Sequence, residues 1–246
     1  MFSYEEYGKI ITLIKESGKQ ATFRDALTMD SYIIMRHDVE FSVERAYELA
    51  CFETENKFRS IYFFQVSNNA YNLLAKRNID MLEEIRHMGH EVGLHFHLNG
   101  LEQIDEIKSA IQKEVEIMNC KLSFSVDIFS IHRPTASVLS SNIKISGLLN
   151  AYQEEFFSYV EDMEKENPDV KYFSDARHQW NYGLVPDKET LFQNKKIQIL
   201  THPYTWTQAG YNNADNFKTL YAEKCQVLLE TFDSECKHFK EIKNEL

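Results

Sequence analysis

The chain has 246 residues and a formal net charge of -11, with 43% hydrophobic and 26% charged residues. This composition is typical of a soluble globular protein, and the length suits a single domain over residues 1–246. The acidic balance argues against a nucleic-acid polymer or an anionic membrane surface as the main partner. The cysteines are scattered and the N-terminus does not resemble a signal peptide, which predicts a cytoplasmic protein. No run of about 20 apolar residues occurs, so we expect no membrane insertion.

Hydrophobic periodicity and breaker residues predict alternating helices and strands along the chain. The predicted helices cover residues 4–18, 43–56, 80–88 with Asp80 as N-cap, 104–118 and 215–243. The predicted strands cover residues 32–35, 60–66, 91–97, 124–131, 170–175 and 196–200, while the pattern over 135–168 is ambiguous. Strands that alternate with helices favour an α/β fold with a parallel sheet.

Polar clusters follow five of these strands, at residues 36–40, 95–99, 131–134, 174–180 and 201–206. Functional groups in parallel sheets lie at the carboxyl ends of the strands. We therefore expect the five clusters to form one enclosed site.

Two of the clusters contain residue types that bind metals. His95 and His97 are two residues apart on a predicted strand, so both imidazoles lie on the same face. Neutral imidazole is a common ligand of zinc and related ions. Asp38 and Glu40 also share a face, so one carboxylate could bind a metal while the other acts as a general base. The alternative is a structural role, since acidic residues stabilise the N-terminus of the helix that follows.

These clusters resemble the five motifs of the polysaccharide deacetylase (NodB-homology) superfamily, in the family's order. The segments are Arg36-His37-Asp38-Val39-Glu40, Gly89-His90-Glu91-Val92-Gly93-Leu94-His95, Ile131-His132-Arg133-Pro134, Asp175 through Trp180, and Ile199-Leu200-Thr201-His202-Pro203. The first segment is closest to the Asp-Val-Asp branch, which is associated with surface-polysaccharide biosynthesis.

The resemblance implies a distorted (β/α)7 barrel that removes an N-acyl group, acetyl or formyl, from an amino sugar. It implies one divalent metal ion per chain, which we expect to be zinc, and a role in O-antigen or capsule biosynthesis. The substrate is an acylated amino sugar that is free, nucleotide-linked, lipid-linked or polymeric.

The chain departs from the family pattern in its metal ligands. The family places a second histidine four residues after the first, where this chain has Asn99. The expected ligands are therefore Asp38, Glu40, His95 and His97, with Asn99 as the alternative to His97. Asp38 is the general base if Glu40 binds the metal, and is itself a ligand if Glu40 does not.

The other expected catalytic residues are His202, Asp175 and Arg133. His202 would protonate the leaving amine, Asp175 would orient His202, and Arg133 would hold the base carboxylate. The residues expected to contact the substrate are Arg36, which could instead form an ion pair within the site, and His132, Arg177, Trp180 and Trp206.

Two alternatives to an N-acyl hydrolase remain open at this level. One is a non-catalytic barrel that binds a glycan or a nucleotide-linked sugar. The other is a different transformation at an amide or carboxylate of the sugar with the same metal site.

Overall fold

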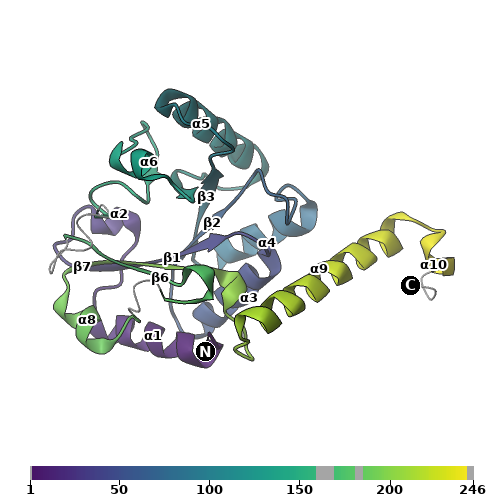
Figure 1. Ribbon diagram of the computed structural model, residues 1–246, viewed down its shortest axis with the longest axis horizontal. Helices are drawn as coiled ribbons and strands as arrows, with labels where there is room; N and C mark the ends of the chain where they lie inside the picture. The colour runs from purple at the N-terminus through teal and green to yellow at the C-terminus, as the bar shows by residue number, and fades with distance from the viewer. Residues whose placement is uncertain (1, 159–168, 181–184, 243–246) are drawn as a thin grey trace.

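The seven strands that the described residues of the computed structural model form are parallel and make one sheet, in the order β5-β4-β3-β2-β1-β7-β6. The structure describes residues 2–158, 169–180 and 185–242. The strands are β1 (Tyr32–Val39), β2 (Ile61–Phe64), β3 (Glu91–His97), β4 (Ile128–His132), β5 (Leu149–Asn150), β6 (Lys171–Ser174) and β7 (Lys196–Thr201). The sheet curls into a half-barrel flanked by helices (Figure 1), which confirms the distorted (β/α)7 fold expected from the sequence.

The main helices follow the predicted order. They are α1 (Tyr4–Ser17), α2 (Phe23–Ala26), α3 (Val43–Glu55), α4 (Lys76–His87), α5 (Ile104–Lys121), α6 (Ala136–Ser140), α8 (Lys188–Gln193), α9 (Asn213–Glu235) and α10 (Phe239–Ile242), with 3-10 turns η1 (Ala176–His178) and η3 (Pro203–Thr205). Within the described ranges, none of these helices combines the length and apolar character needed to cross a lipid bilayer.

Two helix boundaries differ from the prediction. The N-cap prediction for Asp80 is wrong, because α4 begins at Lys76 and Asp80 lies within it, paired with Lys76 at 2.6 Å. Such a pair one turn apart supports the first turn, which has no side-chain cap. The predicted C-terminal helix is divided, since Cys236 leaves the helical conformation and α10 follows.

Alternation along β1 separates the two faces of the sheet. Ile33 and Met35 pack outward against α1, in a core cluster that includes Tyr7 and Ile11. Tyr32 and Ile34 point into the half-barrel, in a cluster with Phe63 of β2 and Phe23 of α2. Because successive side chains alternate, Arg36 and Asp38 continue the inner row toward the carboxyl end of the sheet.

A buried polar network lies on the outer face of β1. The carboxylate of Glu53 on α3 accepts hydrogen bonds from the hydroxyls of Tyr7 (2.5 Å) and Tyr62 (2.7 Å) and lies 3.0 Å from His37 Nε2. The other nitrogen of His37 is 2.6 Å from the hydroxyl of Thr201, the residue before His202. Despite complete burial, which opposes ionisation, His37 helps to lower the pKa of Glu53 to about 2.

Candidate active site

Seven of the predicted site residues line one cavity of about 1010 Å³ at the carboxyl ends of the strands. The cavity wall includes Asp38, Glu40, His95, His132, Arg133, Arg177 and His202, which come from β1, β3, β4, β6 and β7 or directly follow them. The half-barrel therefore brings together residues that are far apart in the sequence.

Three side chains in this cavity could hold a metal ion. One ligand atom from each of Glu40, His95 and His132 lies within 4.8 Å of the other two. Nδ1 of His132 is 3.0 Å from Oε1 of Glu40 and 3.1 Å from Nε2 of His95. Two imidazole nitrogens and a carboxylate oxygen that leave positions open for water are typical of catalytic zinc sites.

The protonation states of two of these residues suit a metal. Burial lowers the pKa of His95 to about 4, so its imidazole is neutral at physiological pH. Burial opposes the ionisation of Glu40, but the hydrogen bond with His132 and the nearby imidazoles lower its pKa to about 2. Metal ligands must be deprotonated in this way.

The hydroxyl of Ser130 orients His95. It lies 2.8 Å from Nδ1 of His95, which leaves Nε2 directed at His132. Ser130 is on β4 directly beside His95 in the strand register. A hydrogen bond to the second ring nitrogen is the usual way in which proteins fix a metal-binding histidine.

His97 lies beside this group. Its ring stacks on that of His132, with centroids 4.9 Å apart, and its Nδ1 accepts a hydrogen bond from the backbone of Asn99. Two residues of strand separate His95 and His97 by about 6.6 Å. His97 and Asn99 line an adjoining cavity of about 470 Å³ that shares His132 with the first. Metal binding by His97 or Asn99 stays a prediction.

Asp38 is buried and paired with Arg36. The guanidinium of Arg36 donates to Oδ2 of Asp38 at 3.0 Å and to the hydroxyl of Tyr152 at 2.6 Å, and stacks on the ring of Tyr152. Oδ1 of Asp38 has a longer contact, 3.4 Å from the hydroxyl of Ser130. Of the two roles predicted for Arg36, a contact with the substrate or an ion pair within the site, the structure has the ion pair.

Arg133 does not contact the base carboxylate in this arrangement. It follows the last residue of β4 with a φ of +46°, and its exposed side chain lies at the rim of both cavities. The position next to Asp38 that was predicted for Arg133 is taken by Arg36.

His202 and Asp175 form a buried pair on the other side of Glu40. Nδ1 of His202 is 2.6 Å from the carboxylate of Asp175, and Nε2 is 3.8 Å from Oε1 of Glu40. Burial alone would favour the neutral imidazole, but the charge and hydrogen bond of Asp175 raise the pKa of His202 to about 9. His202 is therefore protonated at neutral pH, which suits the role of proton donor expected from the sequence.

Trp206 supports Asp175 from behind. Its indole nitrogen donates to the Asp175 carboxylate at 2.7 Å, and the ring packs on Phe2 and Tyr7 in the core. Trp180 packs against the same core cluster. Neither tryptophan belongs to the described cavity wall, whereas Arg177 does and is exposed there.

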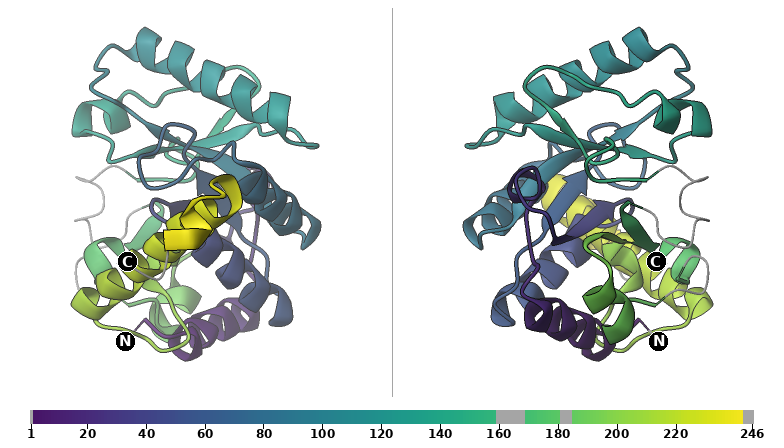
Figure 2. Two further views of the ribbon diagram at one scale, coloured as in Figure 1. Left: turned by 90° about the vertical axis from the view of Figure 1, so that its right-hand side faces the viewer. Right: turned by 90° about the vertical axis from the view of Figure 1, so that its left-hand side faces the viewer.

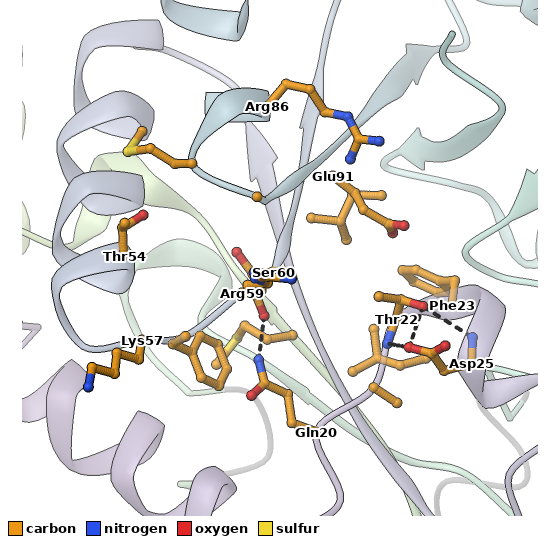
Figure 3. A pocket seen from close by; sticks show the side chains of 17 residues that line it. Gln20, Thr22, Phe23, Asp25, Thr54, Lys57, Arg59, Ser60, Arg86 and Glu91 are labelled. Carbon is orange, nitrogen blue, oxygen red and sulfur yellow. Dashed lines mark hydrogen bonds between the residues drawn. The ribbon is translucent and has the colours of Figure 1, made fainter. Parts of the chain in front are cut away.

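A second cavity, of about 780 Å³, opens at the amino ends of the strands (Figure 3). Its wall holds the cations Lys57, Arg59 and Arg86 and the acids Asp25 and Glu91. None of the residues predicted to form the functional site lines this cavity. Ligands of parallel α/β folds bind at the opposite ends of the strands, so the first cavity is the candidate active site.

No protein-family model matches the chain, and no curated protein does. Among solved structures, the chain is similar to a chitin deacetylase of Colletotrichum lindemuthianum, with 18% identity, a TM-score of 0.44, and coverage of 80% of this chain and 84% of that one. It is similar to a peptidoglycan deacetylase of Bacillus subtilis, with 12% identity, a TM-score of 0.45, and coverage of 88% and 97%.

A third similar structure is a CE4 family pseudoenzyme of Bacillus anthracis, with 14% identity, a TM-score of 0.40 and coverage of 81% of this chain. The match spans 62% of the pseudoenzyme's length. These three neighbours are a chitin deacetylase, a peptidoglycan deacetylase and a CE4 family pseudoenzyme, and the chain resembles each of them only distantly.

Proposed function

We propose that the protein is a metal-dependent hydrolase that removes an N-acyl group from an amino sugar. One observation carries the proposal: Glu40, His95 and His132 face the protonated His202–Asp175 pair across one cavity. Metal ligands opposite a proton donor suit the cleavage of an amide, which needs an activated carbonyl and a protonated leaving nitrogen.

A divalent ion held by Glu40, His95 and His132, which we propose to be zinc, would polarise the acyl carbonyl and make water more acidic. Oδ1 of Asp38 is available to accept the proton of the attacking water, because Oδ2 is held by Arg36. Nε2 of His202 donates its proton to the sugar nitrogen as the C–N bond breaks. Water adds to the carbonyl carbon, and the products are a free amine and a carboxylic acid.

The finer assignments are part of the same proposal. The exposed cations Arg133 and Arg177 at the cavity rim fit a substrate with a carboxylate or phosphate, such as an acidic or nucleotide- or lipid-linked sugar. A cytoplasmic role in surface-polysaccharide biosynthesis belongs to the same proposal, and it rests on the resemblance of residues 36–40 to the Asp-Val-Asp branch.

The alternative is a barrel that binds a glycan without catalysis. A binding module has no need of a histidine that is kept protonated beside potential metal ligands. This pair therefore favours the hydrolase, or another reaction at an amide of the sugar, over the binding module.

Metal analysis by mass spectrometry tests the proposal. We expect about one metal ion per wild-type chain, its loss in His95→Ala and His132→Ala, and its retention in the matched control His97→Ala. The same proteins are then assayed for release of free amine from N-acetylated amino-sugar oligomers. Wild-type protein that binds no metal after reconstitution would refute the proposal. Loss of metal in His95→Ala and His97→Ala, with retention in His132→Ala, would restore the ligand set predicted from the sequence.

A further inference from the structure

The outer face of α9 carries an exposed apolar stripe. The exposed fractions of its side chains are 43% for Phe217, 73% for Tyr221, 52% for Leu228, 40% for Leu229 and 41% for Phe232. At 3.6 residues per turn these five residues lie within about 120° of arc along a helix about 35 Å long. We call them the α9 stripe. Contiguous exposed apolar residues of this kind mark an interaction surface, unlike single scattered ones.

The opposite face of α9 attaches the helix to the rest of the protein. Arg45 on α3 forms a double hydrogen bond with Glu223 (2.7 and 2.8 Å) and another with Asn216 (2.7 Å). Leu220 is buried on this face, and Lys224 reaches Glu44 at 3.2 Å. These contacts fix the rotation of α9. Phe217 lies at the protein-facing edge of the stripe, where its ring is 5.8 Å from that of Tyr204. Tyr221 and Leu228, the most exposed members, face away from the protein. Figures 1 and 2 show α9 extending outward past the helices around the sheet.

The residues of the α9 stripe are arranged almost symmetrically about Cys225. Phe217 and Phe232 lie eight and seven residues from it, and Tyr221 and Leu228 lie four and three residues from it. Two copies of α9 in antiparallel orientation therefore place Phe217 of one copy near Phe232 of the other. Such self-complementarity is what a twofold interface requires.

The helix dipoles favour the antiparallel orientation. An antiparallel pair places the positive N-terminal end of one α9 beside the negative C-terminal end of the other. A parallel pair would bring like ends together. Lys218 at the N-terminal end is already paired with Asp215 at 2.9 Å, so the orientation follows from the dipoles and from the spacing of the apolar residues.

We propose that the α9 stripe is the interface of a homodimer in which two α9 helices pack antiparallel about Cys225. The net charge of -11 and the acidic end of α9 make an anionic lipid surface a poor partner for this face. The interface lies beside the active site, because Phe217 also lines the candidate catalytic cavity. This proposal does not depend on the metal or on the reaction.

Sedimentation analysis of the full chain tests the assembly. We expect a mass of about 58 kDa, twice the 29.0 kDa of the chain, for the wild-type protein. Leu228→Glu should give a folded monomer. The matched control is Leu27→Glu, which adds the same charge at a side chain that is 48% exposed elsewhere, and it should remain a dimer. Circular dichroism confirms that both variants are folded.

Cross-linking with a short bis-maleimide tests the orientation. In variants that keep a single cysteine, the Cys225 pair should lie at the 8–10 Å separation typical of packed helices and cross-link readily. The Cys236 pair, although exposed, should lie roughly 33 Å apart along the helices and stay monomeric on a denaturing gel. The exposed Cys120 serves as the control for random collision.

Three results would overturn the proposal. The first is a wild-type monomer at concentrations of tens of micromolar. The second is cross-linking of Cys236 as efficient as that of Cys225, which indicates a parallel pair. The third is a monomer that co-sediments with lipid vesicles through the α9 stripe, which assigns this face to a membrane surface.

Discussion

Replacing Asp175 by Asn should abolish the elevated pKa of His202. The Asp175 carboxylate lies 2.6 Å from Nδ1 of His202. It accepts hydrogen bonds from the backbone N–H of His202, the hydroxyl of Thr205 and the indole N–H of Trp206. An amide keeps the shape of the carboxylate but removes its charge. Burial, which favours the neutral imidazole, then acts on His202 without the opposing charge that dominates in the wild-type protein.

The size of the effect follows from the two pKa values. His202 has a pKa of about 9 in the folded protein against a reference of 6.5. The difference corresponds to about 3 kcal/mol of net stabilisation of the imidazolium, in which Asp175 is the main favourable partner and Glu40 and Asp38 add to it against the effect of burial. In the variant the pKa of His202 should fall below 6.5, so that less than about 10% of His202 is protonated at pH 7.5. A proton donor for the leaving amine is then largely lost.

The same shift has a defined effect on stability. Since the pKa of His202 is raised by folding, its contribution is fully present below pH 6.5 and is lost as the pH rises through 9. The difference in free energy of unfolding between wild type and Asp175→Asn should therefore shrink by about 3 kcal/mol between pH 6 and pH 10.

NMR titration of the His202 ring in metal-free protein measures the pKa without any substrate. The control is Thr205→Val, which removes one hydrogen bond to Asp175 but keeps its charge and should leave the pKa of His202 near 9. A pKa that stays near 9 in Asp175→Asn would refute the assignment of Asp175 as the residue that keeps His202 protonated.

Three further substitutions test other parts of the structure. Folding lowers the pKa of Glu53 to about 2, so its ionised carboxylate contributes about 3 kcal/mol to the free energy of unfolding above pH 4.5. This contribution is lost as the pH falls toward 2. Urea unfolding of Glu53→Gln should therefore show a weaker loss of stability at acid pH than that of the wild-type protein. Gly93→Ala should cost about 1–3 kcal/mol in the same assay, since the new methyl carbon would lie 2.5 Å from the ring of Phe63; unchanged stability would contradict this packing. Arg36→Met should lower the free energy of unfolding by about 3–5 kcal/mol, and with it the melting temperature, because it leaves the buried carboxylate of Asp38 without its partner. An unchanged melting temperature would show that the ion pair is dispensable.

The sequence was sufficient to predict the fold class and the edge of the sheet that holds the site. Helical and strand periodicities are local properties, and the two-residue period of a strand places Asp38 with Glu40 and His95 with His97 on a common face without knowledge of the other strands. Polar residues at the ends of apolar strands then indicate the carboxyl edge. The same period also places Arg36 on the face of Asp38, a signal for their ion pair that was available in the sequence.

Contacts between neighbouring strands were decided only by the tertiary structure. His97 shares a face with His95, as the two-residue period predicts, and His132 from β4 comes to 3.1 Å from His95. This depends on the register of β3 and β4, with His97 opposite His132, which no local pattern encodes.

The sequence likewise did not predict the direction of the side chains that follow the strand ends. Arg133 leaves β4 in a left-handed conformation, so its side chain lies at the rim and Arg36 holds Asp38. Trp206 follows the turn after His202 into the core, where it supports Asp175. The sequence thus determined which residue types face the cavity, because that follows from local periodicity. The tertiary structure decided which of them meet, because strand register and the backbone turns after each strand arise from packing across the whole sheet.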